Sequence, residues 1–198
     1  KVGKFITQVI LQNIEVEDID LSNATDLRSA WVQNNPALQK LDLSYSTIWG
    51  QGDKETEGNG TYGSSLMVLG CPILKEIKLP EKNELKAYRI DIECLDALET
   101  FDMSNVKMVA ELSIGDLNKD FNLVYPELTI FYSEDGYAGT YFACSENTFY
   151  RESTQAFLKA NYTDIDPDDT VRRLGYTSSL SYDKNKGCRW RTLLNKQK

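Results

Sequence analysis

Histidine is the most informative absence from this chain, because none of the 198 residues is a histidine. Histidine is the commonest general base near neutral pH, and neither a Ser-His-Asp nor a Cys-His arrangement can be built without it. Glycine-rich phosphate loops and dinucleotide fingerprints are missing from the sequence as well. Nothing in the sequence points to the cleft that a two-carboxylate glycosidase needs. We therefore expect that the protein is not an enzyme, and we assign no catalytic residue.

Metal-binding patterns are equally scarce. The four cysteines of the sequence show no C-x-x-C spacing, so zinc lacks its usual ligands when histidine is absent. The aspartates at positions 164, 166 and 168 alternate as the first three ligands of a calcium loop do. The later loop positions do not fit, because Asp169 replaces the required glycine and Gly175 the required glutamate. Capping of a short helix by Asp166 explains the same residues, and we expect neither a metal nor a cofactor.

The sequence also lacks long hydrophobic runs and a surplus of basic residues. It contains no stretch of about 18 apolar residues, so we expect no transmembrane span. Its net charge of −8 argues against nucleic acid as a partner, because phosphate recognition needs a clustered basic surface. The charge is uneven, however, since residues 184–198 carry six basic side chains and no acidic one. This segment either faces the acidic body of its own chain or docks onto an acidic partner or anionic head groups.

A recurring phrase, in which an aspartate lies between two apolar residues and a serine follows, is the main feature that the chain does have. It begins at Ile19, Leu41 and Phe101, and a degenerate copy without the aspartate begins at Ile77. Each copy has an apolar residue three positions before its start, which gives the pattern L-x-x-L-x-L of leucine-rich repeats. These preceding residues are Val16, Leu38, Leu74 and Leu98.

The spacing of the copies supports a repeat. Val16 and Leu38 are 22 residues apart, and Leu74 and Leu98 are 24 apart, both within the usual 20–29 residues. The 36 residues between Leu38 and Leu74 are too many for one repeat, and the excess falls on the glycine-rich and polar residues 49–65. We interpret these residues as a loop inserted into one repeat.

The turns before the predicted strands carry a family resemblance. Residues 71–80 read CPILKEIKLP, and related turns occur at 35–38, 94–98 and 125–128. They resemble the bacterial, Bacteroidetes-type surface-antigen leucine-rich repeat proteins, whose units often read C-x-x-L-x-x-I-x-L-P. The resemblance covers about residues 5–133. It implies export to the cell surface or outer membrane, and we expect a processed lipoprotein whose lipid anchor lies upstream of this chain.

These patterns predict an α/β fold, a leucine-rich-repeat solenoid of short stacked parallel strands with an irregular convex side and a small mixed C-terminal cap. Residues 1–133 form the irregular repeats, with the inserted loop at 49–65, and residues 134–198 form the capping subdomain. The elements expected in the cap are a hairpin that turns at 134–137, a helix over 149–160, a short helix over 166–175, and a closing hairpin of 180–182 with 188–193.

The four cysteines fall into two pairs. Cys71 and Cys94 lie 23 residues apart at nearly equivalent repeat positions, so we expect both to stack as small buried side chains, with a disulfide possible but not required. Cys144 and Cys188 both lie in the C-terminal part, where pairing is possible.

Six residues are our candidates for binding. Alternation along the strands predicts that Asp20, Asp42, Lys78 and Asp102 form an outward column, which is either a solvated sheet face or a ligand-contacting concave surface. Trp49 and Tyr62 lie on the inserted loop, and exposed aromatic residues are good anchors at interfaces. Trp49 either serves as such an anchor or folds back to cover the solenoid edge.

Two functions follow from this interpretation. The first is a non-enzymatic surface recognition protein that binds a protein or a glycan through the repeat sheet face and the inserted loop. The second, which the family resemblance implies, is an accessory lipoprotein subunit of an outer-membrane nutrient-uptake complex built around a TonB-dependent transporter.

Overall fold

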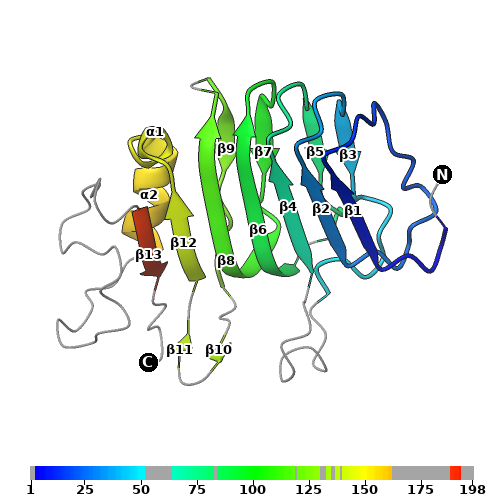
Figure 1. Ribbon diagram of the computed structural model, residues 1–198. Coiled ribbons are helices and arrows are strands. Elements are labelled where there is room, and N and C mark those ends of the chain that lie inside the picture. Colours follow the sequence, from blue (N-terminus) through cyan, green and yellow to red (C-terminus); the bar gives the residue numbers. More distant parts are fainter. Residues whose placement is uncertain are drawn as a thin grey trace.

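The chain folds mainly into parallel β-strands, with helices near its C-terminal end (Figure 1). The computed structural model describes residues 3–51, 64–82, 84–118, 120–129, 133–134, 137–138, 140–161 and 188–192. The strands are β1 (Gln8–Gln12), β2 (Ser29–Gln33), β3 (Lys40–Asp42), β4 (Ser65–Leu69), β5 (Glu76–Lys78), β6 (Leu85–Leu95), β7 (Thr100–Asp102), β8 (Val106–Leu117), β9 (Asn122–Val124), β10 (Ser133–Glu134), β11 (Tyr137–Ala138), β12 (Thr140–Cys144) and β13 (Cys188–Thr192). The helices are α1 (Glu146–Phe149) and α2 (Glu152–Asn161).

The strands form two layers. The main sheet has the order β1-β2-β4-β6-β8-β12-β13, in which the first six strands are parallel and β13 is antiparallel to β12. Behind it lies a second layer of short parallel pairs, β3 with β5 and β7 with β9, and β5 contacts β7 (Figure 1). The chain passes from one layer to the other, since β2 leads to β3, β4 to β5, β6 to β7 and β8 to β9. This mostly parallel α/β architecture is compatible with the predicted solenoid-like fold.

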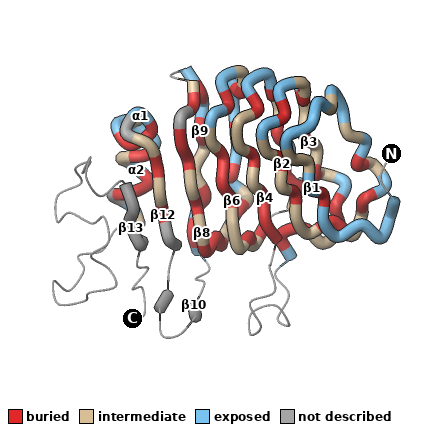
Figure 2. Tube along the Cα trace, viewed as in Figure 1, coloured by how far each residue is buried: buried red, intermediate tan, exposed pale blue. Residues whose placement is uncertain are grey.

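Three of the four L-x-x-L-x-L phrases lie in the second layer, on β3, β5 and β7, whereas the copy that begins at Ile19 forms no strand. The sequence predicted only this column of strands, joined by irregular segments on the opposite side of the solenoid. In the structure the opposite side is the main sheet, which contains the longer strands. The apolar positions of the phrases are buried, as the pattern predicted, and they fill the core between the two layers. Figure 2 shows buried residues alternating with more exposed ones along the strands. The buried positions are Leu38, Leu41, Leu43, Leu74, Ile77, Leu79, Leu98, Phe101 and Met103.

Corners with left-handed backbone follow the first strands of the main sheet. Asn13, Asn34, Gly70 and Cys94 have φ angles of 54°, 51°, 63° and 55°, and each directly follows one member of the register row that starts at Gln12. Backbone hydrogen bonds and a 2.9 Å bond from Asn34 Nδ2 to Asn13 Oδ1 link neighbouring corners. The chain therefore turns in the same way at the end of each of these strands.

This corner corrects one expectation about the cysteines. Cys71 is buried, as predicted, and its burial raises the pKa of its thiol. Cys94 is exposed, because it occupies the corner position of Gly70 rather than the buried position that follows it. The predicted stacking of two buried cysteines is therefore right for Cys71 and wrong for Cys94.

The main sheet continues across the boundary predicted at residue 133, because β12 pairs in parallel with β8. Beside β12, Phe157 of α2 stacks on Tyr125 with ring centroids 4.5 Å apart and meets Phe142 edge-on at 5.5 Å. The helices thus lie at this end of the core, where a cap was expected, and the division into two domains stays a prediction. None of the helices in the described part of the chain is long and apolar enough to cross a membrane.

The predicted hairpins differ in their pairing. The first hairpin was expected to pair residues 128–133 with residues 140–144. In the structure β10 pairs antiparallel with β11 over two residues, whereas 140–144 forms β12 and pairs with β8 and β13, so the expected partner of this strand is wrong. The strand at 188–192 pairs with β12, and its predicted partner at 180–182, like the predicted helix at 166–175, lies outside the described residues. Cys144 and Cys188 are register partners in this pair, so their disulfide stays a prediction that the strand pairing permits.

Candidate functional site

The recurring aspartates of the second layer hold their own turns. One carboxylate oxygen, Oδ1, accepts a hydrogen bond from the backbone N–H of the serine two residues later, at 3.0 Å for Asp20, 3.0 Å for Asp42 and 2.8 Å for Asp102. This is the local turn that aspartate favours, and at Asp42 and Asp102 it ends the short strands β3 and β7. The phrase that suggested a binding column is therefore used for turn formation.

Charges on β3 and β5 neutralise one another. Lys40 Nζ lies 3.3 Å from Asp42 and 3.0 Å from Glu76, and Lys78 Nζ lies 3.2 Å from Glu76. The hydrogen bond to Glu76 raises the pKa of Lys40 and lowers that of Glu76. Burial acts to raise the pKa of Asp42, but hydrogen bonds from Ser44 and Lys40 outweigh it and lower that pKa. We call these four residues the charge ladder. Of the two alternatives given for Asp42 and Lys78, a solvated sheet face or a ligand-contacting surface, the ladder favours the solvated face.

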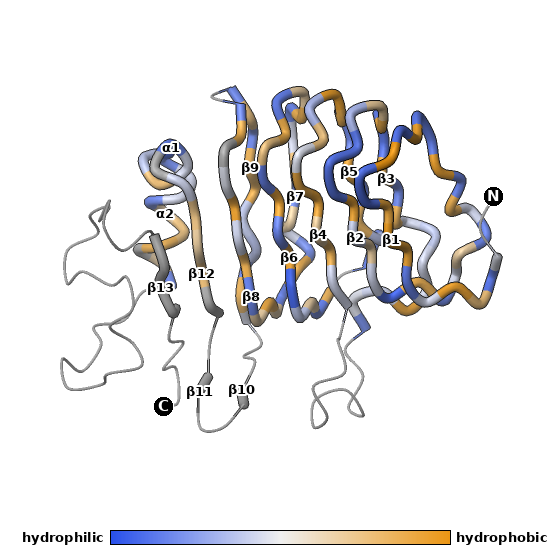
Figure 3. The backbone as a smooth tube through the Cα atoms, viewed as in Figure 1, coloured by the Kyte–Doolittle hydropathy of each residue, from blue (hydrophilic) through white to orange (hydrophobic). Residues whose placement is uncertain are grey.

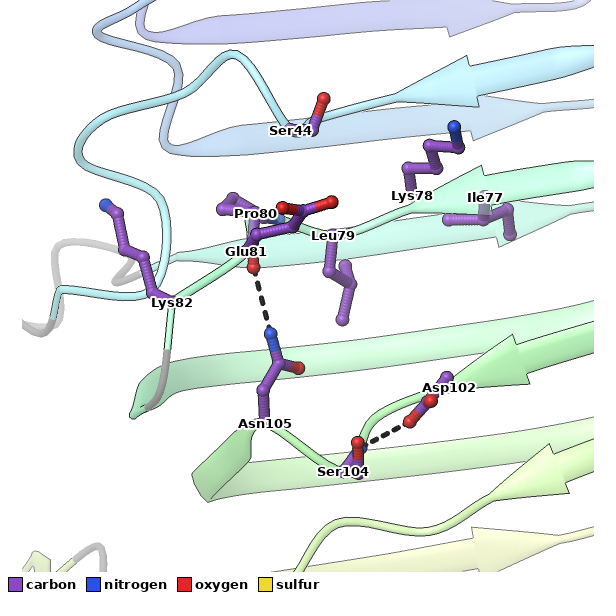
Figure 4. A pocket seen from close by; sticks show the side chains of 10 residues that line it. All are labelled: Ser44, Ile77, Lys78, Leu79, Pro80, Glu81, Lys82, Asp102, Ser104 and Asn105. Atoms are coloured by element: carbon purple, nitrogen blue, oxygen red, sulfur yellow. Dashed lines mark hydrogen bonds between the residues drawn. The ribbon is translucent and has the colours of Figure 1, made fainter.

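A hollow of about 660 Å³ lies beside the ladder, between the ends of β5 and β7 (Figure 4). It brings together two predicted residues, Lys78 and Asp102, but neither Asp20 nor Asp42 lines it. Two of its polar side chains have partners within the chain. Lys82 donates to the carbonyl of Thr47, and burial lowers the pKa of its ammonium. Asn105 donates to the carbonyl of Pro80 at 2.9 Å. The lining residues are Ser44, Ile77, Lys78, Leu79, Pro80, Glu81, Lys82, Asp102, Ser104 and Asn105.

Trp49 lies in the core and not on the surface. Its side chain is 0% exposed, and its Nε1 donates to the carbonyl of Ser65 at 3.4 Å. Its backbone N–H donates to Ser46 Oγ at 2.8 Å. The assignment of Trp49 as a binding residue is therefore wrong, and it folds back over the edge of the core instead. Tyr62 lies outside the described residues.

The outer face of the main sheet carries a site that our sequence analysis missed. The strand register aligns Ile10, Trp31, Met67, Asp91 and Ser113 in one row across β1, β2, β4, β6 and β8. Their chain neighbours Val9, Ala30, Val32, Leu66, Val68, Ile90, Ile92, Leu112 and Ile114 are buried in the core. The row therefore faces away from the second layer, because successive side chains of a strand point to opposite faces.

No helix in the described part of the chain covers this face over β1 to β8, since α1 and α2 lie beside β12 (Figure 1). Parallel sheets commonly have both faces covered, so an open face is unusual. The row is apolar over β1, β2 and β4, where Ile10 is 50% exposed and Trp31 and Met67 are partly buried, and the outward positions on either side include Gln8, Gln12, Ser29 and Gln33. Trp31 Nε1 is shielded from solvent and has no acceptor among the described residues.

The other half of the outer face is charged. Figure 3 shows hydrophilic and hydrophobic residues alternating along β6, and the hydrophilic ones include Arg89, Asp91 and Glu93. Arg89 Nη2 donates to Asp91 Oδ2 at 2.9 Å, and Arg89 Nη1 lies 3.7 Å from Glu111 on β8. Ser113 Oγ donates to Glu93 Oε1 at 3.0 Å. These side chains line a hollow of about 220 Å³.

Asp91 is the unusual member of this cluster. It is 5% exposed, and its second oxygen, Oδ1, has no hydrogen-bond donor among the residues that the structure describes. A buried carboxylate oxygen without a donor carries a desolvation penalty. In the described ranges no group of three or more His, Cys, Asp and Glu residues is arranged to hold a metal ion.

Comparison with family models, with curated proteins and with solved structures finds no match for this chain.

Proposed function

We propose that the protein is a non-enzymatic recognition protein, a leucine-rich-repeat solenoid that binds another macromolecule on the outer face of its main sheet. The observation that carries this proposal is the row formed by Ile10, Trp31 and Met67, which leaves apolar surface open on a parallel sheet beside a carboxylate with an unused acceptor. Exposed apolar surface next to polar groups is typical of interaction sites.

This proposal moves the binding surface from the second layer to the main sheet. In the second layer the predicted residues hold turns or neutralise one another, and their solvated ion pairs contribute little to affinity. On the outer face, by contrast, a partner gains by covering apolar side chains.

We further propose that the protein acts at the cell surface or outer membrane of a Bacteroidetes-type bacterium, as the repeat pattern of residues 71–80 suggests. The accessory lipoprotein subunit is the second candidate. The basic segment 184–198 favours it, because such a segment suits docking onto an acidic partner or anionic head groups.

The test is affinity capture of the tagged chain from detergent-solubilised membranes of its source, with two matched variants. Ile10→Asp places a charge on the outer face, and Tyr45→Asp places one in the turn after β3, where the side chain is 48% exposed, against 50% for Ile10. We expect the captured partner to be lost with Ile10→Asp and kept with Tyr45→Asp. Equal capture by both variants would contradict the outer face as the binding surface. A transporter as the partner would support the accessory subunit.

A further inference from the structure

The free edge of β1 is a surface that the proposed function does not use. β1 is the first strand of the main sheet, and β2 is its only pairing partner among the described residues. In a parallel pair every second residue of a strand bonds to the same neighbour. The Thr7 carbonyl and the Asn13 N–H make the outermost of these bonds to β2, at 3.1 and 2.9 Å. The backbone N–H and C=O groups of Gln8, Ile10 and Gln12 therefore point to the free edge.

This edge has none of the features that usually protect a sheet edge from pairing, which are a lysine, a proline, a bulge or a covering segment. Residues 6–12 read ITQVILQ, without charge, proline or glycine, and the register of β1 with β2 is continuous. The two helices of the described part of the chain lie at the opposite end of the sheet (Figure 1). Exposed apolar side chains gather at the edge instead, from Phe5, Ile6, Ile10 and Ile14.

The edge is complementary to itself. When two copies of β1 pair antiparallel about a two-fold axis at Ile10, Ile10 lies opposite its counterpart and Gln8 lies opposite Gln12 of the second copy. All three residues direct their backbone groups outward, so each makes a hydrogen-bonded pair, and about six backbone hydrogen bonds form. No like charges face each other within the strands, because β1 has none. The facing glutamine amides supply both donors and acceptors.

The residues that flank β1 fit the same axis. Antiparallel pairing places the start of β1 in one copy beside its end in the other, and a two-fold contact repeats each such pairing. Exposed Ile6 precedes the strand and exposed Ile14 follows it, so an apolar side chain lies at both ends. Exposed Lys4 precedes the strand and exposed Glu15 follows it, so the two ends carry opposite charges.

We infer that two copies of the chain associate by antiparallel pairing of β1 with β1, which continues the main sheet from one copy into the other. Cross-strand partners point to the same face of a sheet, so the outer faces of both copies point the same way. The two rows of Ile10, Trp31 and Met67 then meet end to end at Ile10. The dimer thereby joins them into a single apolar row.

Sedimentation velocity of the purified full chain, over about a hundredfold range of concentration, tests this inference. We expect one copy at the lowest concentration and two at the highest. Ile10→Lys places like charges on the two-fold axis and should weaken the dimer at least about tenfold. Tyr45→Lys, at a residue of matching exposure in the turn after β3, should leave the dimer unchanged.

Two double variants test the antiparallel register. Gln8→Lys combined with Gln12→Lys places lysines opposite each other in both flanking pairs and should weaken the dimer about tenfold. Gln8→Lys combined with Gln12→Glu places opposite charges there and should dimerise at least as tightly as the unsubstituted chain. Both variants lose the same bond from Gln12 Nε2 to Gln33 Oε1, so that loss does not affect the comparison.

Hydrogen exchange of the backbone amides, followed by NMR, measures the pairing residue by residue. The Val9 and Leu11 amides face β2 and should be protected at every concentration. The Ile10 and Gln12 amides should exchange rapidly in the monomer and become protected in the dimer.

Three results would overturn the inference. They are a monomer at every concentration, equal dimerisation of the two double variants, and protection of the Ile10 amide in the monomer. The first would leave the edge to an extended segment of another protein, and the last would mean that a segment of the same chain covers it. If the chain stays monomeric while Ile10→Asp still abolishes partner capture, the inference fails and the proposed function stands.

Discussion

At the scale of single residues, the aspartate of the recurring phrase has a structural task. Asp42 accepts from the Ser44 amide at 3.0 Å and takes part in the charge ladder through Lys40. The pattern in the sequence is the same whether such an aspartate binds a ligand or holds a turn. Its position in the fold distinguishes the two, because the acceptor points back to its own backbone.

The turn predicts a graded effect of substitution at Asp42. Asp42→Ala removes the acceptor for the Ser44 amide and should lower the free energy of unfolding by about 1 kcal/mol. Asp42→Asn keeps an oxygen at the same place and should retain most of that stability. Urea unfolding of both variants measures the difference. Equal losses would show that the ion pair with Lys40, and not the turn, carries the effect.

The charge ladder predicts a loss of stability in acid. The pKa values of Asp42 and Glu76, ordinarily 3.8 and 4.5, are lowered in the folded protein. A carboxyl group with a lowered folded pKa contributes stability that is present above its unfolded pKa and is lost as the pH falls through the folded value. Stability should therefore decline as the pH drops below about 4.5, and less steeply in Lys40→Met.

Urea unfolding between pH 6 and about 2.5 follows this decline. Lys75→Met is the matched control, because Lys75 is an exposed lysine outside the ladder. If the free energy of unfolding fell as steeply with pH in Lys40→Met as in the unsubstituted protein, the ladder would not be the cause of the lowered pKa values of Asp42 and Glu76.

At the scale of elements, the inserted loop starts inside the core. Trp49 is buried and Gly50 has a φ of 76°, a left-handed backbone that side chains rarely adopt. A Cβ at Gly50 would lie 2.5 Å from Leu85 Cδ2, so the chain passes too close to β6 for any side chain. The sequence marked residues 49–65 by composition, but composition does not reveal that the first residues of the insertion pack against the main sheet.

Gly50→Ala should therefore destabilise the protein by about 2 kcal/mol, because it adds a clash with Leu85 to an unfavourable backbone angle. Thermal or urea unfolding measures the loss. Gly3→Ala serves as the control, because a Cβ there would meet no atom within 4 Å. A loss below about 0.5 kcal/mol for Gly50→Ala would show that the start of the insertion relaxes freely.

The corners at the ends of β1, β2, β4 and β6 are a second feature of the elements that the sequence did not predict. Different residue types, asparagine, glycine and cysteine, occupy the same left-handed position. Because asparagine and glycine tolerate this backbone best, Cys94 is the unexpected occupant. A search for a constant residue at a constant spacing misses such a column.

At the scale of the whole molecule, the sequence predicted the buried half of the fold well and the open half poorly. The L-x-x-L-x-L positions were identified because burial requires apolar residues at fixed alternation, as at Leu41 and Leu43. The main sheet was missed, because strands such as β6 mix arginine, aspartate and glutamate on their outer face and resemble a polar connection. The alternation of Arg89, Asp91 and Glu93 with buried isoleucines was the signal available.

The apolar row of the outer face was missed for the same reason. Ile10, Trp31 and Met67 come from strands that are far apart in the sequence, and parallel pairing brings them into one row. Four of the six predicted candidates were taken from the repeated phrase, whose aspartates serve the turns. A residue that recurs in the sequence, such as the turn aspartate, indicates a structural role that is repeated. The row on the outer face, in contrast, has a different residue on each strand.

The most direct test of the outer face as the recognition surface is site-specific photo-cross-linking in the source organism. Benzoylphenylalanine replaces Met67 in the centre of the outer face or Tyr45 in the turn after β3. We expect a discrete cross-linked partner from position 67 and none from position 45. A partner that cross-links from position 45 alone, or equally from both positions, would contradict the outer face as the binding surface.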